Sequence, residues 1–140
     1  MEINELKHID KTVRGWLSES RDNVLRKIDT RLTVDTKTSR KDLVTNVDKQ
    51  NEKYLVGKIR EFDPDSKILG EEGFGDQVHS TKGRIWIIDP IDGTMNFVKQ
   101  RNNFAIMIAL YEDGKGVLGY VMDVIGKHLL SGGPDLGVFD

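Results

Sequence analysis

Two aspartates stand three residues apart in the middle of the chain, in the run WIIDPIDGTMNF over residues 86–97. An apolar run typical of a buried strand precedes Asp89, and Pro90 cannot donate to a sheet, so we expect the strand to end at Asp89. Gly93 permits a close backbone approach, and Thr94 is a good N-cap for a short helix. Carboxylates on one turn beside free helix-start amides can hold hard cations and a phosphate together.

Acidic residues upstream could join this pair. Glu71 and Glu72 follow a short apolar run at residues 67–70, and Asp48 stands three residues after Thr45. Each feature also has a purely structural interpretation. Asp-Pro and Asp-Gly pairs are common in turns, a glutamate pair in a Gly-rich turn is usually a solvated corner, and Thr45 with Asp48 forms a capping box. Both interpretations stay open at this point.

The elements that would position these residues can be predicted from hydrophobic periodicity. Residues 3–29 show helical spacing and predict one amphipathic helix, with residues 18–20 as the place where it could break. A second helix is expected after Thr45, ending at the Asp-Pro-Asp run of residues 63–65. Residues 30–42 are polar and without period, which indicates a loop or a weak hairpin.

The second half of the chain predicts strands. Residues 103–111 and 117–125 are apolar runs separated by a turn at Asp113-Gly114, and another turn at Gly126-Lys127 leads to further short strands. Two long N-terminal helices packed on a mainly antiparallel sheet make the fold class α+β. We expect residues 1–140 to form a single domain.

Composition limits the partners of this domain. The 140 residues are 37% hydrophobic and 31% charged with a net charge of -2, which is ordinary for a globular protein and gives no reason to expect a nucleic acid polymer or a membrane as partner. The basic residues of the 30–42 loop are diluted by Asp35 and Asp42 and lack aromatic neighbours. There is no cysteine and no signal-peptide pattern, so a cytoplasmic location is expected.

Three segments together resemble the signature of the inositol monophosphatase family of metal-dependent phosphatases. They are WIIDPIDGTMNFV at residues 86–98, DLVTNVD at residues 42–48 and ILGEE at residues 68–72. The resemblance covers roughly residues 37–140. It implies the N-terminal half of the layered α/β sandwich of the inositol monophosphatase and fructose-1,6-bisphosphatase superfamily, whose members are Mg²⁺-dependent and lithium-sensitive. Family members are longer, and a later W-D motif with another metal-binding aspartate has no counterpart here.

The resemblance also implies a ligand set for metal ions. Glu71 and the carbonyl of Ile91 would join Asp89 at one Mg²⁺, and Asp92 would join Asp89 at a second. Such a set suits Mg²⁺, which prefers oxygen ligands and keeps several waters, and Mn²⁺ is an alternative ion. Asp89 would then bridge the two ions.

The remaining roles concern substrate and water. By resemblance, Asp92, Gly93 and Thr94 would bind the substrate phosphate, while Asp48 and Thr94, together with the metal ligand Glu71, would serve catalysis by holding and activating the attacking water. Lys37 would lie in a flap over the metal site. Direct attack by water needs no covalent intermediate, and the chain has no Ser-His-Asp constellation.

Two classes of function follow. The first is a Mg²⁺-dependent phosphatase that hydrolyses a small phosphate monoester, with inositol monophosphate as the first candidate and a nucleotide 3'-phosphate or fructose-1,6-bisphosphate as related choices. The second is a non-catalytic module or fragment that binds metal or phosphate, favoured by the missing W-D motif. The resemblance further implies a homodimer.

Overall fold

The computed structural model of the chain describes residues 1–27, 34–36, 43–93 and 104–139. Two helices and eight strands lie within these ranges. In chain order they are α1 (Ile3–Lys27), β1 (Val34–Thr36), β2 (Leu43–Thr45), α2 (Asn46–Phe62), β3 (Lys67–Gly70), β4 (Arg84–Asp92), β5 (Ala105–Glu112), β6 (Lys115–Asp123), β7 (His128–Gly133) and β8 (Gly137–Phe139).

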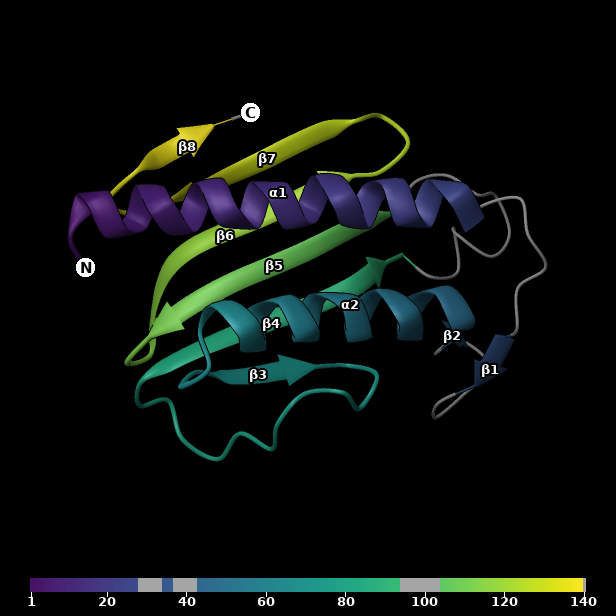
Figure 1. Cartoon of the computed structure of the whole chain (residues 1–140), viewed down its shortest axis with the longest axis horizontal. Helices are drawn as coiled ribbons and strands as arrows, with labels where there is room; N and C mark the ends of the chain where they lie inside the picture. The colour runs from purple at the N-terminus through teal and green to yellow at the C-terminus, as the bar shows by residue number, and fades with distance from the viewer. Residues whose placement is uncertain (28–33, 37–42, 94–103, 140) are drawn as a thin grey trace.

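Strands β3 to β8 form one sheet in which the spatial order follows the chain order. Strands β3 and β4 are parallel, and every other neighbouring pair is antiparallel. Both helices lie on the same side of this sheet, with α2 beside β4 and α1 nearer to β6 and β7 (Figure 1). The predicted α+β class with a mainly antiparallel sheet is confirmed. The sequence predicts a loop or a weak hairpin over residues 30–42; β1 lies within this range and pairs antiparallel with β2, which begins just after it.

The β5–β6 hairpin shows why the chain turns where the sequence predicts. Asp113 and Gly114 have φ values of 51° and 81°, the left-handed pair that a two-residue hairpin turn requires. Aspartate and glycine adopt this conformation at low cost, whereas a β-branched residue would be strained there. The register on either side of this turn is therefore fixed locally.

The core lies between the helices and one face of the sheet. Trp86 of β4 is fully buried, and its ring lies 5.8 Å from that of Trp16 on α1. The ring of Trp16 in turn packs edge-to-face on that of Phe62 of α2, with 5.5 Å between the ring centroids. These aromatic contacts join both helices to β4.

The sequence predicts a buried strand before Asp89, and the structure buries this run mainly on the face toward the helices. Trp86 and Ile88 face the helices, whereas Ile87 between them is 37% exposed. Alternate side chains of a strand point to opposite faces, and no element among the described residues covers the second face of β4. The predicted break in the first helix is wrong, because α1 runs without interruption from Ile3 to Lys27.

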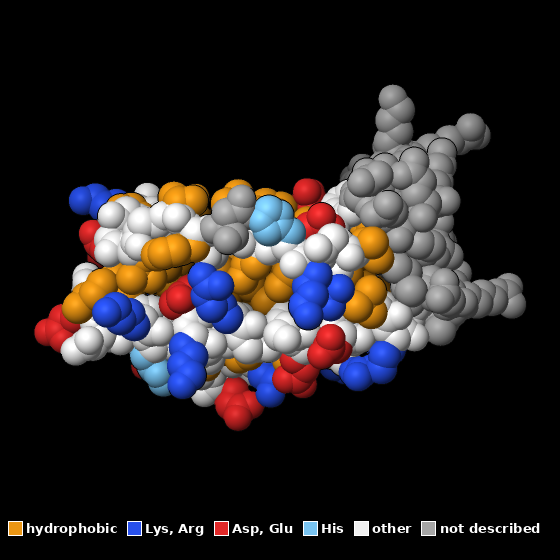
Figure 2. Space-filling model, turned by 90° about the horizontal axis from the view of Figure 1, so that it is seen from above, with side chains coloured by type: hydrophobic (Ala, Val, Ile, Leu, Met, Phe, Trp, Pro, Cys, Tyr) orange, Lys and Arg blue, Asp and Glu red, His pale blue; other side chains and the backbone are white. Residues whose placement is uncertain are grey.

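Exposed apolar side chains continue across the uncovered face and along the β7–β8 edge. Seen from above the view of Figure 1, hydrophobic side chains form a broken band between charged ones (Figure 2). Over the uncovered face and this edge taken together, the large apolar side chains that are exposed are Leu69, Ile87, Tyr111, Leu130, Val138 and Phe139. Within the described residues, neither helix carries the long, nearly uncharged apolar stretch that a membrane crossing requires.

Candidate metal centre

The parallel pairing of β3 and β4 brings the first two predicted carboxylates to the same edge of the sheet. Gly70, the last residue of β3, lies opposite Ile88 of β4, so Glu71 and Asp89 follow at equivalent positions. The carboxyl ends of β3 and β4 and the start of α2 gather on the right side of Figure 1. A third carboxylate, Asp48, stands in the first turn of α2.

Strand β4 does not end at Asp89, and this corrects the prediction. It continues to Asp92, but its pairing with β5 is irregular between Asp89 and Asp92. The irregularity takes Pro90, which has no N–H, out of the regular ladder, and the carbonyl of Pro90 accepts a hydrogen bond of 2.9 Å from Nδ2 of Asn51. The turn follows at Gly93, whose φ of 86° suits glycine.

Asp48 has the capping role that the sequence predicts. Its N–H donates to Oγ1 of Thr45 at 3.1 Å, and its Oδ1 accepts from the N–H of Thr45 at 3.1 Å and also from the Thr45 hydroxyl. The capping box is therefore confirmed. These bonds hold Asp48 in place with only 1% of its surface exposed, at the end of the molecule where Glu71 and Asp89 meet.

Asp89 is the electrostatic centre of the group. Burial raises its pKa, and the negative charges of Glu71 and Asp92, a hydrogen bond with Asp92 and the charge of Asp48 raise it further, to about 7. Oδ1 of Asp89 is buried and has no hydrogen-bond partner among the described residues. An aspartate that is crowded by carboxylates and leaves one buried oxygen unsatisfied fits a cation ligand.

The carboxylates fit a metal ion by their chemistry, but they are not arranged around one. Within the described residues no three Asp, Glu or His side chains converge on a common point as metal ligands do. Asp92 instead bonds to Asp89, the arrangement expected when carboxylates crowd together with one of them protonated. Hard oxygen donors from three separate elements nevertheless form a donor set that Mg²⁺ accepts, and rotation of side chains alone changes their aim.

Two buried polar residues of α2 belong to the same region and were missed by sequence reasoning about the site. Asn51, which holds the Pro90 carbonyl, also accepts a hydrogen bond from the hydroxyl of Ser20 on α1. Glu52 is fully buried. Asp48, Asn51 and Glu52 have the i, i+3, i+4 spacing of a single helix face, which is the signal that could have identified them.

Other predicted site residues have different outcomes. Ile91 is buried in β4, and Glu71 is exposed just after β3. Thr94, with the short helix expected after it, and Lys37 lie outside the described residues. The structure thus brings together Asp48, Glu71, Asp89 and Asp92.

A concavity of about 810 Å³ opens beside these carboxylates on the uncovered face of the sheet. Glu71, Asp89 and Asp92 form its acidic end. The rest of its lining is mostly apolar and includes Ile87, Met107 and other side chains that point away from the helices. The carboxylates therefore border a large apolar surface.

The fold as a whole is that of inositol monophosphatases. A crystal structure of an IMPase/NADP phosphatase complexed with NADP and Ca²⁺ superposes with a TM-score of 0.88 at 36% identity, covering 96% of this chain and 51% of that chain. One of an IMPase/NADP phosphatase complexed with Mg²⁺ and phosphate gives a TM-score of 0.85 at 36% identity, covering 96% of this chain and 51% of that chain.

Sequence comparison leads to the same family. The inositol monophosphatase family model matches residues 5–139. The inositol-1-monophosphatase of Bacillus subtilis is 47% identical over 86% of this chain and 46% of that protein. The fructose-1,6-bisphosphatase/inositol-1-monophosphatase of Thermotoga maritima is 46% identical over 63% of this chain and 33% of that protein. The chain belongs to the inositol monophosphatase family and spans less than half the length of these two relatives.

Proposed function

We propose that this chain carries the metal- and phosphate-binding part of a phosphatase that hydrolyses a small phosphate monoester. The observation that carries the proposal is the crowding of Asp48, Glu71 and Asp92 around Asp89, which leaves one buried oxygen of Asp89 unsatisfied. Family membership supports the same function, as does the Mg²⁺ and phosphate bound to a related structure.

The proposed metal ligands are Glu71, Asp89, Asp92 and the carbonyl of Ile91. Bound Mg²⁺ would neutralise charge on the phosphoryl oxygens and lower the pKa of a coordinated water. The chain itself holds the proposed ligands in position. The bond from Asn51 to the Pro90 carbonyl fixes the irregular part of β4, so that Asp89 and Asp92 are presented from a rigid strand.

Asp48 and Thr94 are proposed to hold the attacking water. The described capping bonds of Asp48 use Oδ1 and fix the carboxyl group in one orientation, so the cap and the proposed catalytic role are compatible. The N–H groups of Gly93 and Thr94, with Asp92, are proposed to contact the substrate phosphate, and Lys37 to lie in a flap above it.

Inositol monophosphate is the first candidate substrate. Related proteins are described as acting on NADP or fructose-1,6-bisphosphate as well, so the choice among phosphate esters is an experimental question. A homodimer and a cytoplasmic location remain predictions from the sequence.

The first test is metal binding. Calorimetric titration of the purified chain with Mg²⁺ and with Mn²⁺ should give saturable binding, which Asp89→Asn should weaken more than any other single substitution. No saturable binding of either ion would refute the proposal.

The second test is turnover. Phosphate release from inositol monophosphate, NADP and fructose-1,6-bisphosphate should be measured in millimolar Mg²⁺, for residues 1–140 and for a longer form of the length of the relatives. Because the apolar face beside the carboxylates is open in the described residues, we expect residues 1–140 alone to fold but to hydrolyse these esters poorly. Turnover by residues 1–140 at the rate of the longer form would contradict that expectation.

A further inference from the structure

We propose that Glu52 is a positioning residue that holds the metal ligand Glu71 in place. The proposal rests on the proposed function, because it assigns a second layer of residues to the same metal centre. Glu52 lies on α2 one turn after Asp48, and its side chain is fully buried. A buried carboxylate is costly unless its oxygens accept several hydrogen bonds, so its partners indicate what it does.

The partners of Glu52 are the backbone amides that follow Glu71. The N–H of Glu72 donates to both carboxylate oxygens, at 2.9 Å to Oε1 and 3.0 Å to Oε2. The N–H of Phe74 donates to Oε2 at 3.1 Å. Glu52 is therefore hydrogen-bonded to the backbone directly after the proposed ligand Glu71.

Glu52 also contacts the residue before Glu71. A Cβ atom on Gly70 would lie 2.6 Å from Oε1 of Glu52, closer than non-bonded atoms can approach. The carboxylate thus packs against the bare α-carbon of Gly70 while it holds the amide of Glu72. One side chain thus lies against Gly70 and binds the amide of Glu72, the two neighbours of Glu71.

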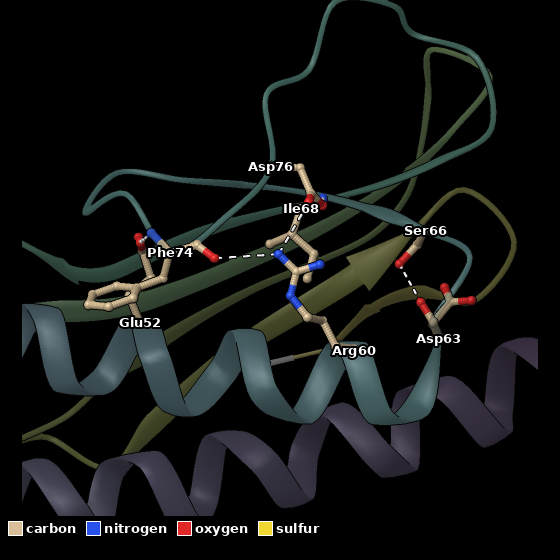
Figure 3. A network of polar contacts seen from close by, with 7 residues as sticks. All are labelled: Glu52, Arg60, Asp63, Ser66, Ile68, Phe74 and Asp76. Atoms are coloured by element: carbon tan, nitrogen blue, oxygen red, sulfur yellow. Dashed lines mark hydrogen bonds and ion pairs between the residues drawn. The ribbon is translucent and has the colours of Figure 1, made fainter.

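The far end of the same loop is tied to the same helix. Arg60, two turns after Glu52 on α2, donates to Oδ1 of Asp76 at 3.1 Å, and Oδ2 of Asp76 accepts from the N–H of Ile68 at 2.9 Å. The N–H of Asp76 donates a hydrogen bond of 2.7 Å to the carbonyl of Ile68. Figure 3 shows Glu52 and Arg60 rising from α2 toward Phe74 and Asp76.

The consequence is a fixed geometry between two proposed site residues. Asp48 and Glu52 stand on one helix, so a loop that is fixed to Glu52 is also fixed relative to Asp48. Substitution of a residue that holds a metal ligand by hydrogen bonds typically lowers metal affinity on the order of 10- to 100-fold. Glu52 would act in this way through the backbone on both sides of Glu71, without contacting the ion.

The test compares Glu52→Gln with the unchanged chain. Glutamine has the same shape, but its amide nitrogen cannot accept a hydrogen bond, so at least one of the three hydrogen bonds to the loop is lost, and the glutamine NH2 group then faces a backbone N–H of the loop. We expect the Kd for Mn²⁺ to rise on the order of tenfold. Hydrogen exchange at the amides of Glu72 and Phe74 should accelerate.

Three further variants control this result. Glu61→Gln removes a charge from an exposed position of α2 and should change neither readout. Val56→Ala, on a buried position of the same helix, lowers stability without touching the loop and should leave the Kd unchanged. Gly70→Ala pushes against the Glu52 carboxylate from the other side and should reproduce both effects of Glu52→Gln, which keeps the proposal testable if Glu52→Gln fails to fold.

The outcomes separate this proposal from the proposed function. If the unchanged chain binds Mn²⁺ and Glu52→Gln binds it equally well, Glu52 is not a positioning residue. The same holds if Val56→Ala weakens binding as much as Glu52→Gln does at equal loss of stability. If the unchanged chain binds no Mn²⁺, the proposed function fails, and accelerated exchange at Glu72 and Phe74 would then reduce Glu52 to a structural anchor of the loop.

Discussion

Carboxylates cluster at both ends of β4, but the charge of the two clusters is balanced differently. At its start, Arg84 lies among three acidic side chains: an ion pair to Glu5 of α1, one of 3.5 Å to Asp63 after α2 and one of 3.7 Å to Glu112 of β5. At its end, Asp89 lies among Asp48, Glu71 and Asp92, and every contribution to its pKa raises it. At the start of β4 the cation is therefore a side chain of the protein, Arg84.

This contrast teaches what each end is for. A guanidinium that is fixed among carboxylates joins α1, the end of α2, β4 and β5 permanently, because arginine keeps its charge at all relevant pH values. Carboxylates that are crowded without such a group repel each other, and the repulsion can be relieved by a proton or by an exchangeable metal ion. The first cluster is a structural joint, and the second is suited to binding.

The largest expected effect comes from Asp89→Asn. It should weaken Mg²⁺ binding more than any other single change and lower the rate of a catalytically competent longer form on the order of a hundredfold or more, because Asp89 is the proposed bridge between the ions. In EDTA at pH 7.5 it should instead raise the melting temperature, because it removes a buried, crowded charge. Equal Mg²⁺ affinity of the variant in calorimetry would refute the bridging role.

Asp48→Asn should come next. Asparagine keeps the shape and an oxygen for the cap, so we expect a stability loss of at most about 1 kcal/mol. The rate of the longer form should fall on the order of a hundredfold, because the carboxylate that orients water is lost. Thermal melting and turnover on the same variant separate the two roles, and intact turnover would leave Asp48 as a cap only.

Arg84→Gln tests the opposite end of the strand. It leaves three acidic side chains without their shared cation, and because Arg84 is partly exposed we expect a loss of only about 1 to 2 kcal/mol of unfolding free energy. Urea denaturation measures this loss, and Mg²⁺ affinity should stay unchanged. A measurable drop in Mg²⁺ affinity in Arg84→Gln would show that the two ends are not independent.

A further prediction concerns pH dependence. The pKa of Asp89 is raised from 3.8 to about 7 in the folded state, so the folded chain keeps a proton that the unfolded chain has released across this range. Metal-free stability from Asp89 therefore falls as pH rises from about 4 to 7 and levels off above it. Saturating Mg²⁺ should flatten the trend, because the metal-bound folded chain and the unfolded chain then both lack the Asp89 proton, and Asp89→Asn should remove it. Melting temperatures between pH 5 and 8.5, with EDTA or Mg²⁺, measure both effects.

Much of this architecture could be predicted from sequence because it is encoded locally. The capping box at Thr45, the hairpin turn at Asp113-Gly114 and the delivery of Glu71 after a short strand each depend on a few adjacent residues. The extension of β4 past Asp89 could not be predicted in the same way. It depends on Asn51, thirty-nine residues earlier in the chain, holding the carbonyl of Pro90.

The residues of the candidate site also differ in how far they could be predicted from local sequence. Type and spacing indicate the four carboxylates only as candidates, and the family resemblance then gives them their roles. The parallel register of β3 and β4 accounts for the proximity of Glu71 and Asp89. Glu52 could not be identified, because a glutamate in a charged helix is usually at the surface. Its burial becomes evident only when the loop after Glu71 is placed against α2.

The order of the strands has a consequence for how the molecule forms. Each strand from β3 to β8 pairs with the strand that precedes or follows it in the chain, so the sheet can grow by adding one neighbour at a time during synthesis. Folding is faster when contacts are close in sequence, and the β4–β7 hairpins meet this condition. The slow step should be the docking of α1 and α2 onto the sheet, because the bonds from α2 to Pro90 and Glu72 span thirty-nine and twenty residues. Asp48 of α2 would then be the last carboxylate to join Glu71, Asp89 and Asp92, on a sheet that is already built.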